Sequence, residues 1–207
     1  MKTSAMVGAV GMALLGEAAG ATLNFEADAL GGAPAGWVTG VTGKGSPRWT
    51  VESDATSPGA SKVLTQSGSG TFPWAVRKDV AMIDGSVEVR FKSLGGKEDE
   101  AGGVVWRWKD GDNYYVARAN ALEDNVALYY TSNGRRNTIR YVDAPVAKNA
   151  WHILRVEFKG SHIRVALDGK TCIEADDSHI GGPGAVGVWT KADSKTAFAE
   201  FRYATQP

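Results

Sequence analysis

Residues 152–173 have the sequence HILRVEFKGSHIRVALDGKTCI, in which apolar and polar residues alternate. Leu154, Val156 and Phe158 share one face of the first segment, and the same pattern resumes after a short turn. Period-two alternation is typical of a strand that buries one face. An Asp-Gly pair at 168–169 supplies the positive φ that a two-residue hairpin turn needs. The stretch therefore predicts three consecutive antiparallel strands.

The same alternation recurs along most of the chain after residue 22. In Ser86–Lys92, for example, Val87, Val89 and Phe91 lie on one face. The 26 glycines, and the rarity of apolar residues spaced three and four apart, argue against helices. Further strands are expected at 23–26, 49–52, 62–66, 103–109, 114–120, 125–131, 138–142, 185–190 and 198–203. Many short strands at this spacing predict an all-β protein of two packed sheets.

The first 21 residues have the pattern of a secretory signal peptide. Lys2 precedes an apolar run at 5–15, and small residues at 19–21 form a cleavage site. Residues 22–207 are then expected to form a single domain in an exported protein, periplasmic or extracellular. The apolar run is shorter than the roughly 20 residues of a membrane-spanning helix, so no membrane span is expected. Glu17 interrupts the signal pattern and leaves a retained N-terminal anchor as the alternative.

Charge and cysteine content exclude several classes of protein. Lysine plus arginine and aspartate plus glutamate both number 23, so no net field attracts a polyanion and nucleic acid is not an expected partner. A single cysteine, Cys172, excludes an internal disulfide. We expect a monomer that requires no cofactor for its fold.

From residue 101 onward, seven segments form a recognisable series of sequence motifs. They are GGVVWR at 102–107, DNYYVARAN at 112–120, LEDNVALY at 122–129, WHILRV at 151–156, LDGK at 167–170, GVWTKAD at 187–193 and FAEF at 198–201. These segments resemble the laminin-G-like, concanavalin-A-like sandwiches of the bacterial 3-keto-disaccharide hydrolase domain family. The resemblance implies a two-sheet antiparallel jelly-roll sandwich with a concave sheet. The family includes catalytic members and apparent binding modules, so function must be argued from the site.

A candidate carbohydrate groove follows from which residues share the predicted concave face. Alternation sets Trp189 and Lys191 opposite the apolar residues of their strand, and sets Arg118 and Asn120 opposite two alanines. Sugar recognition needs an aromatic ring for the apolar side of the sugar and planar polar groups for its hydroxyls. We therefore predict a lectin-like site in which Trp189 is the stacking platform. Its polar contacts are predicted to come from Arg107, Arg118, Asn120, Lys191 and Asp193.

The same residues allow a purely structural interpretation. Trp189 would then pack under a loop, while Arg107 and Arg118 would pair with Glu123 or Asp124 to hold the sheet. A third class of hypothesis is a structural or adhesion module that binds protein at its loop rims.

A glycoside-processing enzyme is the alternative function, with Asp193 or Glu123 as the acid or base. A retaining glycosidase needs two carboxyl groups about 5 to 5.5 Å apart. The glucanases that share the implied fold carry Glu, Asp and Glu at alternate positions of one strand, and no predicted strand has that pattern. The acidic run at 97–100 is instead expected to be a solvated loop.

Calcium is the one metal that the implied fold leaves open, because such sandwiches hold it through loop oxygens. The candidate donors are Glu26, Asp124, Asn125, Asp176 and Asp177. Exposed turn acids are the competing interpretation of the same residues. One cysteine and three scattered histidines give no support for zinc.

Overall fold

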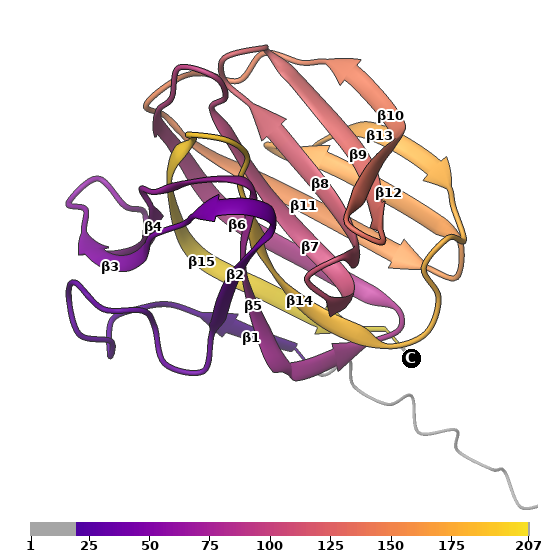
Figure 1. Cartoon of the computed structure of the whole chain (residues 1–207), viewed down its shortest axis with the longest axis horizontal. Coiled ribbons are helices and arrows are strands. Elements are labelled where there is room, and N and C mark those ends of the chain that lie inside the picture. Colours follow the sequence, from indigo (N-terminus) through magenta and orange to yellow (C-terminus); the bar gives the residue numbers. More distant parts are fainter. Residues whose placement is uncertain (1–19, 207) are drawn as a thin grey trace, which may run out of the picture.

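The computed structural model describes residues 20–206, which form the strands labelled in Figure 1. The strands are β1 (Gly20–Leu23), β2 (Val38–Ser46), β3 (Trp49–Ser53), β4 (Lys62–Gln66), β5 (Ser69–Met82), β6 (Gly85–Gly95), β7 (Ala101–Asp110), β8 (Asn113–Asn120), β9 (Asn125–Ser132), β10 (Arg135–Asp143), β11 (Trp151–Lys159), β12 (His162–Leu167), β13 (Lys170–Asp176), β14 (Gly184–Trp189) and β15 (Lys195–Thr205). The predicted three-strand meander is confirmed as β11, β12 and β13, in which consecutive strands pair antiparallel.

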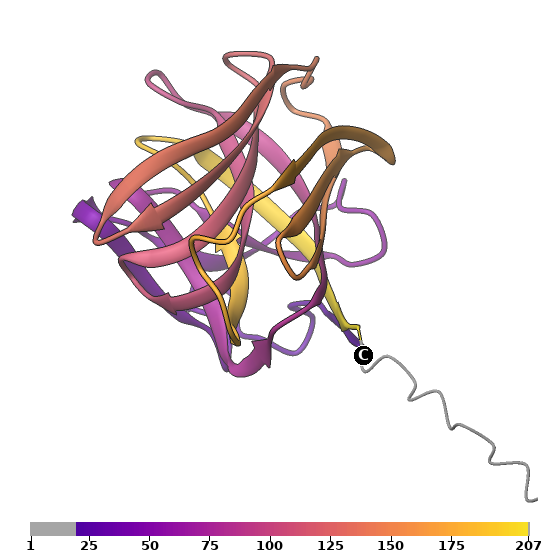
Figure 2. The same ribbon diagram turned by 90° about the vertical axis from the view of Figure 1, so that its right-hand side faces the viewer.

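The strands form two antiparallel sheets that stack as a sandwich (Figures 1 and 2). The eight-stranded sheet has the order β13-β12-β11-β6-β15-β4-β3, with β1 added beside β15. The seven-stranded sheet has the order β10-β9-β8-β7-β14-β5-β2. The predicted all-β, two-sheet jelly-roll sandwich is therefore confirmed.

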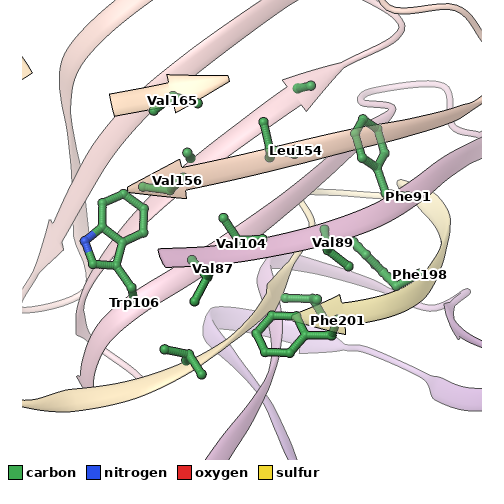
Figure 3. Close-up of a cluster of buried hydrophobic side chains, with 14 of the residues drawn as sticks. Val87, Val89, Phe91, Val104, Trp106, Leu154, Val156, Val165, Phe198 and Phe201 are labelled. Carbon is green, nitrogen blue, oxygen red and sulfur yellow. The ribbon is translucent and has the colours of Figure 1, made fainter. Parts of the chain in front are cut away.

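The main hydrophobic core fills the space between the sheets (Figure 3). Each strand contributes alternate side chains, as the sequence pattern predicts. The residues labelled in Figure 3 are Val87, Val89 and Phe91 of β6, Val104 and Trp106 of β7, Leu154 and Val156 of β11, Val165 of β12, and Phe198 and Phe201 of β15. All of them are 0% exposed. Burial of apolar surface on this scale is the main force that holds the two sheets together.

Two strands of the seven-stranded sheet, β2 and β5, were not predicted. Glycines at 40, 43 and 45 break the alternation of β2, and Pro73 interrupts that of β5. The segment predicted at 23–26 is a strand only at Leu23, and Phe25 leaves the sheet to pack in the core at 1% exposure. Glycine and proline thus hid two strands that pairing holds in the sheet, β5 against β14 and β2 against β5.

The predicted signal segment, residues 1–21, lies outside the described residues except for its last two. Gly20 and Ala21 pair with Ala204 and Tyr203 of β15, and Thr22 and Leu23 continue the same ladder. Within residues 20–206 there is no helix long and apolar enough to cross a membrane.

Leu154 offers a direct test of the core. We expect Leu154→Ala to lower the free energy of unfolding by about 2 to 5 kcal/mol, because it leaves a cavity between the sheets. Leu122→Ala is the matched control, since Leu122 is 40% exposed and its loss should cost less than about 0.5 kcal/mol. Urea denaturation of both variants measures the difference. Equal effects of the two substitutions would contradict the packing described above.

Candidate functional site on the concave sheet

The seven-stranded sheet carries a second apolar cluster on the face that points away from the core. Its members are Trp74, Val76, Ala101, Val105, Trp108, Tyr114, Val116, Ala127, Tyr129, Ala185 and Trp189, with Phe72 packed against them. A sheet with apolar side chains on both faces is covered on both sides or holds a ligand on one of them.

This face is concave, as the position of Arg136 demonstrates. Arg136 belongs to β10 at one edge of the sheet, and Phe72 belongs to β5 five strands away. The Arg136 guanidinium nevertheless lies 4.8 Å from the centroid of the Phe72 ring. Strands are spaced about 4.8 Å apart, so a flat sheet would separate these strands by about 24 Å. The sheet must therefore curl around this face, and the curvature creates the hollow described below.

Trp189 is on the predicted face but is not the predicted open platform. Its side chain is 0% exposed, and Phe72 stacks on it with ring centroids 5.5 Å apart and an interplanar angle of 24°. The indole Nε1 donates a hydrogen bond to the Tyr114 hydroxyl at 3.4 Å. Covered in this way, Trp189 has the buried packing role of the structural interpretation, although Phe72 of strand β5 covers it where that interpretation expected a loop. The prediction that its ring is an exposed stacking surface is wrong.

Arg107 points to the opposite side from the one predicted, because the β7 ladder shifts register between Trp106 and Asp110. Arg107 has a φ of 45°, and a bulge of this kind reverses the face of the residues that follow. Its guanidinium donates to the carbonyls of Ile83, Ile180 and Gly160 and lies 5.7 Å from the Phe158 ring. Arg107 therefore ties loops together at one end of the sandwich and takes no part in the concave face.

Arg118 and Asn120 lie on the concave face, as predicted, but both are buried and occupied. Arg118 donates to Asn125 Oδ1 at 2.5 Å and to Glu123 Oε2 at 3.0 Å, so its pairing with Glu123 matches the structural interpretation. Asn120 Nδ2 donates to Asp99 Oδ1 at 2.9 Å. These residues hold the rim of the face in place.

The charged run at 97–100 is only in part the solvated loop that was expected, since Lys97 and Glu98 are exposed whereas the next two residues are buried. Asp99 is 0% exposed and Glu100 is 5% exposed. Asp99 forms an ion pair with Lys191 in addition to its bond from Asn120, and Glu100 accepts a hydrogen bond from Ser93 at 2.8 Å. Burial raises the pKa of Asp99, and the neighbouring Lys191 opposes that effect. Asp99 and Glu100 fold inward because each buried carboxylate has polar partners.

Asp193 holds this loop from the other side. Its carboxylate accepts hydrogen bonds from the backbone amides of Lys97, Glu98 and Asp99 at 2.7, 2.9 and 3.1 Å. Desolvation acts to raise the pKa of Asp193, but the amide bonds outweigh it and the pKa is lowered. The carboxylate therefore stays ionised near neutral pH.

Glu123 is similarly held ionised. Desolvation again acts to raise its pKa, while the hydrogen bond from Asn125 and the charge of Arg118 lower it. Its side chain is 39% exposed. Neither Glu123 nor Asp193 has the raised pKa that a general acid needs, so both are suited to accept protons or hydrogen bonds.

The hollow itself has a volume of about 690 Å³. It is lined by Lys44, Gly45, Ser69, Gly70, Thr71, Phe72, Glu98, Arg136, Lys191, Ala192 and Asp193. The structure thus brings Lys191 and Asp193 together here, as predicted, and adds residues that the sequence did not single out. The volume is in the range of about 300 to 1,000 Å³ that is common for ligand sites.

Arg136 is the most informative residue that sequence reasoning missed. Its guanidinium lies 4.3 Å from the Tyr129 ring, 4.8 Å from Phe72 and 5.9 Å from Trp189. Within residues 20–206 its Nη1 is buried without a hydrogen-bond partner, and no carboxylate pairs with it. Burial lowers the pKa of Arg136, yet an arginine remains charged at neutral pH.

The outer face of the eight-stranded sheet provides a contrast. An unbroken ladder of alternating charges crosses five of its strands in the order Glu174, Arg164, Glu157, Arg155, Glu88, Arg202, Glu200 and Arg90. Within the described chain, every other arginine that is not exposed also pairs with a carboxylate. Arg136 is thus the exception, and it is in the hollow.

The candidate calcium donors do not come together. Glu26 accepts hydrogen bonds from the amides of Ser61 and Lys62, Asp124 accepts one from Val146, and Asp177 accepts one from Tyr115. Across the part of the chain that the structure describes, no group of three or more His, Cys, Asp or Glu is arranged to hold a metal ion.

Known proteins share this architecture. No family model matches the chain. The carbohydrate-binding module CBM66 from Bacillus subtilis superposes with a TM-score of 0.66 at 22% identity, covering 82% of this chain and 94% of that one. A β-glucanase from Bacillus licheniformis superposes with a TM-score of 0.53 at 14% identity, covering 90% of this chain and 98% of that one. The expected concanavalin-A-like sandwich is confirmed at the level of the fold.

One curated protein is similar in sequence. A levanase from Bacillus subtilis strain 168 is 28% identical over 135 residues, which are 64% of this chain and 18% of the levanase. The chain thus spans less than a fifth of that relative. Membership of the 3-keto-disaccharide hydrolase domain family stays a prediction.

Asp193 gives a pH-dependent test of the site's framework. Its lowered pKa means that it stabilises the fold above its unfolded pKa of about 3.9, and that this contribution disappears as the pH falls through the lower folded value. We expect Asp193→Asn to lower the free energy of unfolding most near pH 7, with the difference from wild type shrinking below about pH 4.

Urea denaturation at both pH values measures the effect of Asp193→Asn. Asp176→Asn is the control, because it removes an equal charge from a side chain that is 75% exposed. A difference from wild type that grew as the pH fell would be inconsistent with the role assigned to Asp193.

Proposed function

We propose that this protein binds carbohydrate in the hollow of its concave sheet, with Arg136 as the central polar contact. The observation that carries the proposal is the half-buried guanidinium of Arg136, which forms no ion pair with any carboxylate of residues 20–206. An arginine in this state has already lost part of its hydration, so a ligand that supplies oxygen acceptors gains charge-assisted hydrogen bonds at little further cost.

The surroundings of Arg136 suit a sugar. The rings of Phe72 and Tyr129 lie against the guanidinium and restrict its movement, which favours binding of two adjacent oxygens by its paired N–H groups. Asp193, which is ionised, and Lys191 also line the hollow and add an acceptor and a donor. Adjacent hydroxyls of a sugar ring both accept and donate hydrogen bonds, which matches this mixture better than a purely anionic ligand does.

The similarity to a carbohydrate-binding module supports the same conclusion. Because the relative found by sequence is a levanase, levan is the first polysaccharide to test. Inulin, mixed-linkage β-glucan and mannan complete a panel that keeps other sugar classes open.

A glycoside-processing activity of the 3-keto-disaccharide hydrolase type is the second candidate, with Asp193 or Glu123 in the catalytic role. The lowered pKa of both carboxylates favours a base over an acid. Prolonged incubation with the panel, followed by product analysis, separates the two candidates. Products formed by wild type and lost in Glu123→Gln would establish the enzyme.

The setting that we propose is an exported monomer, periplasmic or extracellular, where polysaccharides are met. Calcium is proposed only as an optional addition. Binding measured with calcium and with a chelator, on protein of known mass in solution, examines both points.

Arg136→Ala is the decisive substitution for the binding proposal. We expect it to weaken binding of the recognised glycan by at least about tenfold, because charge-assisted bonds to the sugar are lost. The fold should be unaffected, since Arg136 forms no ion pair within the described residues. Arg136→Lys keeps the charge but lacks the planar guanidinium, so its affinity for the glycan should lie between those of wild type and Arg136→Ala.

Isothermal titration calorimetry provides the measurement. Arg140→Ala is the control, because Arg140 is an exposed arginine of the same strand. Wild-type affinity in a folded Arg136→Ala variant would rule out the proposed site.

A further inference from the structure

We infer that the concave face holds a second sugar subsite, formed by Tyr141 and Glu123, so that the preferred ligand is an oligosaccharide that spans both. This inference rests on the proposed function, since it extends the same site. It commits to a ligand of at least two sugar residues, with the Arg136 hollow and the Tyr141 subsite each taking one end.

A bulge in β10 is what places the two subsites on one face. Arg136 and Tyr141 are five positions apart, and in a regular strand they would point to opposite sides. The β10–β9 ladder shifts register between Thr138 and Arg140, so Arg136 pairs with Thr131 and Tyr141 pairs with Ala127. Ala127 belongs to the apolar cluster of the concave face, and Thr131 lies four residues further along the same strand. Both side chains of β10 therefore lie on the concave face.

Tyr141 offers the open aromatic ring that Trp189 does not. The residue is 48% exposed, and it is the one aromatic residue among the exposed large hydrophobic residues of the described chain. Its hydroxyl accepts a hydrogen bond from Asn125 Nδ2, and Asn125 is itself 0% exposed. An exposed ring that is already fixed in position can stack on a sugar with little loss of conformational entropy.

Glu123 provides the polar partner beside this ring. Its Oε2 accepts the hydrogen bonds from Arg118 and Asn125, at 3.0 Å each, whereas within residues 20–206 its Oε1 accepts none. Hydrogen bonding and the Arg118 charge keep the carboxylate ionised despite desolvation. An ionised, half-exposed carboxylate with a free oxygen is a strong acceptor for sugar hydroxyls.

The two subsites share a common border. The Tyr129 hydroxyl accepts a hydrogen bond from Arg118 at 3.2 Å, and the Tyr129 ring lies under the Arg136 guanidinium. Lys191 lines the hollow and also acts electrostatically on Glu123. Arg136 and Tyr141 pair with positions four apart on β9, so at about 3.3 Å per residue their backbone positions are roughly 13 Å apart, farther than one sugar ring extends.

The test is calorimetric titration with fragments of one, three and five sugar residues from each polysaccharide of the panel, levan first. Wild type should bind the trimer at least about tenfold more tightly than the monomer. Tyr141→Ala should remove most of that gain while leaving monomer affinity within about twofold. Tyr141→Phe keeps the ring and should retain the gain.

Arg136→Ala separates this inference from the proposal on which it rests. It should weaken binding of every fragment, including the monomer. Equal wild-type affinity for monomer and pentamer, or a folded Tyr141→Ala variant with undiminished pentamer affinity, would overturn the second subsite alone. Absence of wild-type binding to every fragment would overturn the proposed function and the subsite together.

Discussion

The curvature of the seven-stranded sheet is the constraint on which the candidate site depends. It carries Arg136 from the edge strand β10 onto the ring of Phe72 in β5, where the guanidinium rests on aromatic side chains and pairs with no carboxylate of the described chain. Glycines permit the close packing beneath it. A Cβ on Gly187 would lie 2.1 Å from the Ala75 carbonyl oxygen, and one on Gly103 would lie 2.7 Å from that of Ala117. Side chains at these positions would push the strands apart.

The outer face of the eight-stranded sheet and the concave face of the seven-stranded sheet differ in how their charged side chains are paired. On the eight-stranded sheet, arginines and glutamates alternate and neutralise one another, which suits a face in contact with water. On the concave sheet, buried Asp99, Arg118 and Asn120 bond to other protein groups, although Arg118 Nε has no hydrogen-bond partner in the described chain. The Arg136 guanidinium, which rests on aromatic rings, and one oxygen of Glu123 also lack a hydrogen-bond partner within residues 20–206. Asp99, Arg118 and Asn120 thus fix the edge of the concave face, while Arg136 and Glu123 supply the unpaired polar atoms on which the proposed sugar site depends.

Sequence alternation predicted most of the strands and the correct face for Arg118, Asn120 and Trp189, because period-two patterns survive wherever pairing is regular. It failed where pairing is irregular. Bulges in β7 and β10 reversed the face of Arg107 and concealed that of Arg136 and Tyr141. The burial of Asp99 depends on Lys191 and Asn120, which are distant in the chain, so the acidic run gave no local sign of it. The burial of Trp189 was not foreseen because Phe72, which stacks on it, belongs to β5, a strand that the sequence pattern did not predict.

The central claim is that sugar binds on the concave face at Arg136, and a crystal structure of the protein with an oligosaccharide of the recognised glycan tests it most directly. The account predicts sugar density in the hollow, with two sugar oxygens within hydrogen-bond distance of the Arg136 guanidinium. The oligosaccharide should extend from there toward Tyr141. Sugar density at the loop rims or on the outer face of the eight-stranded sheet, with Arg136 uncontacted, would contradict it.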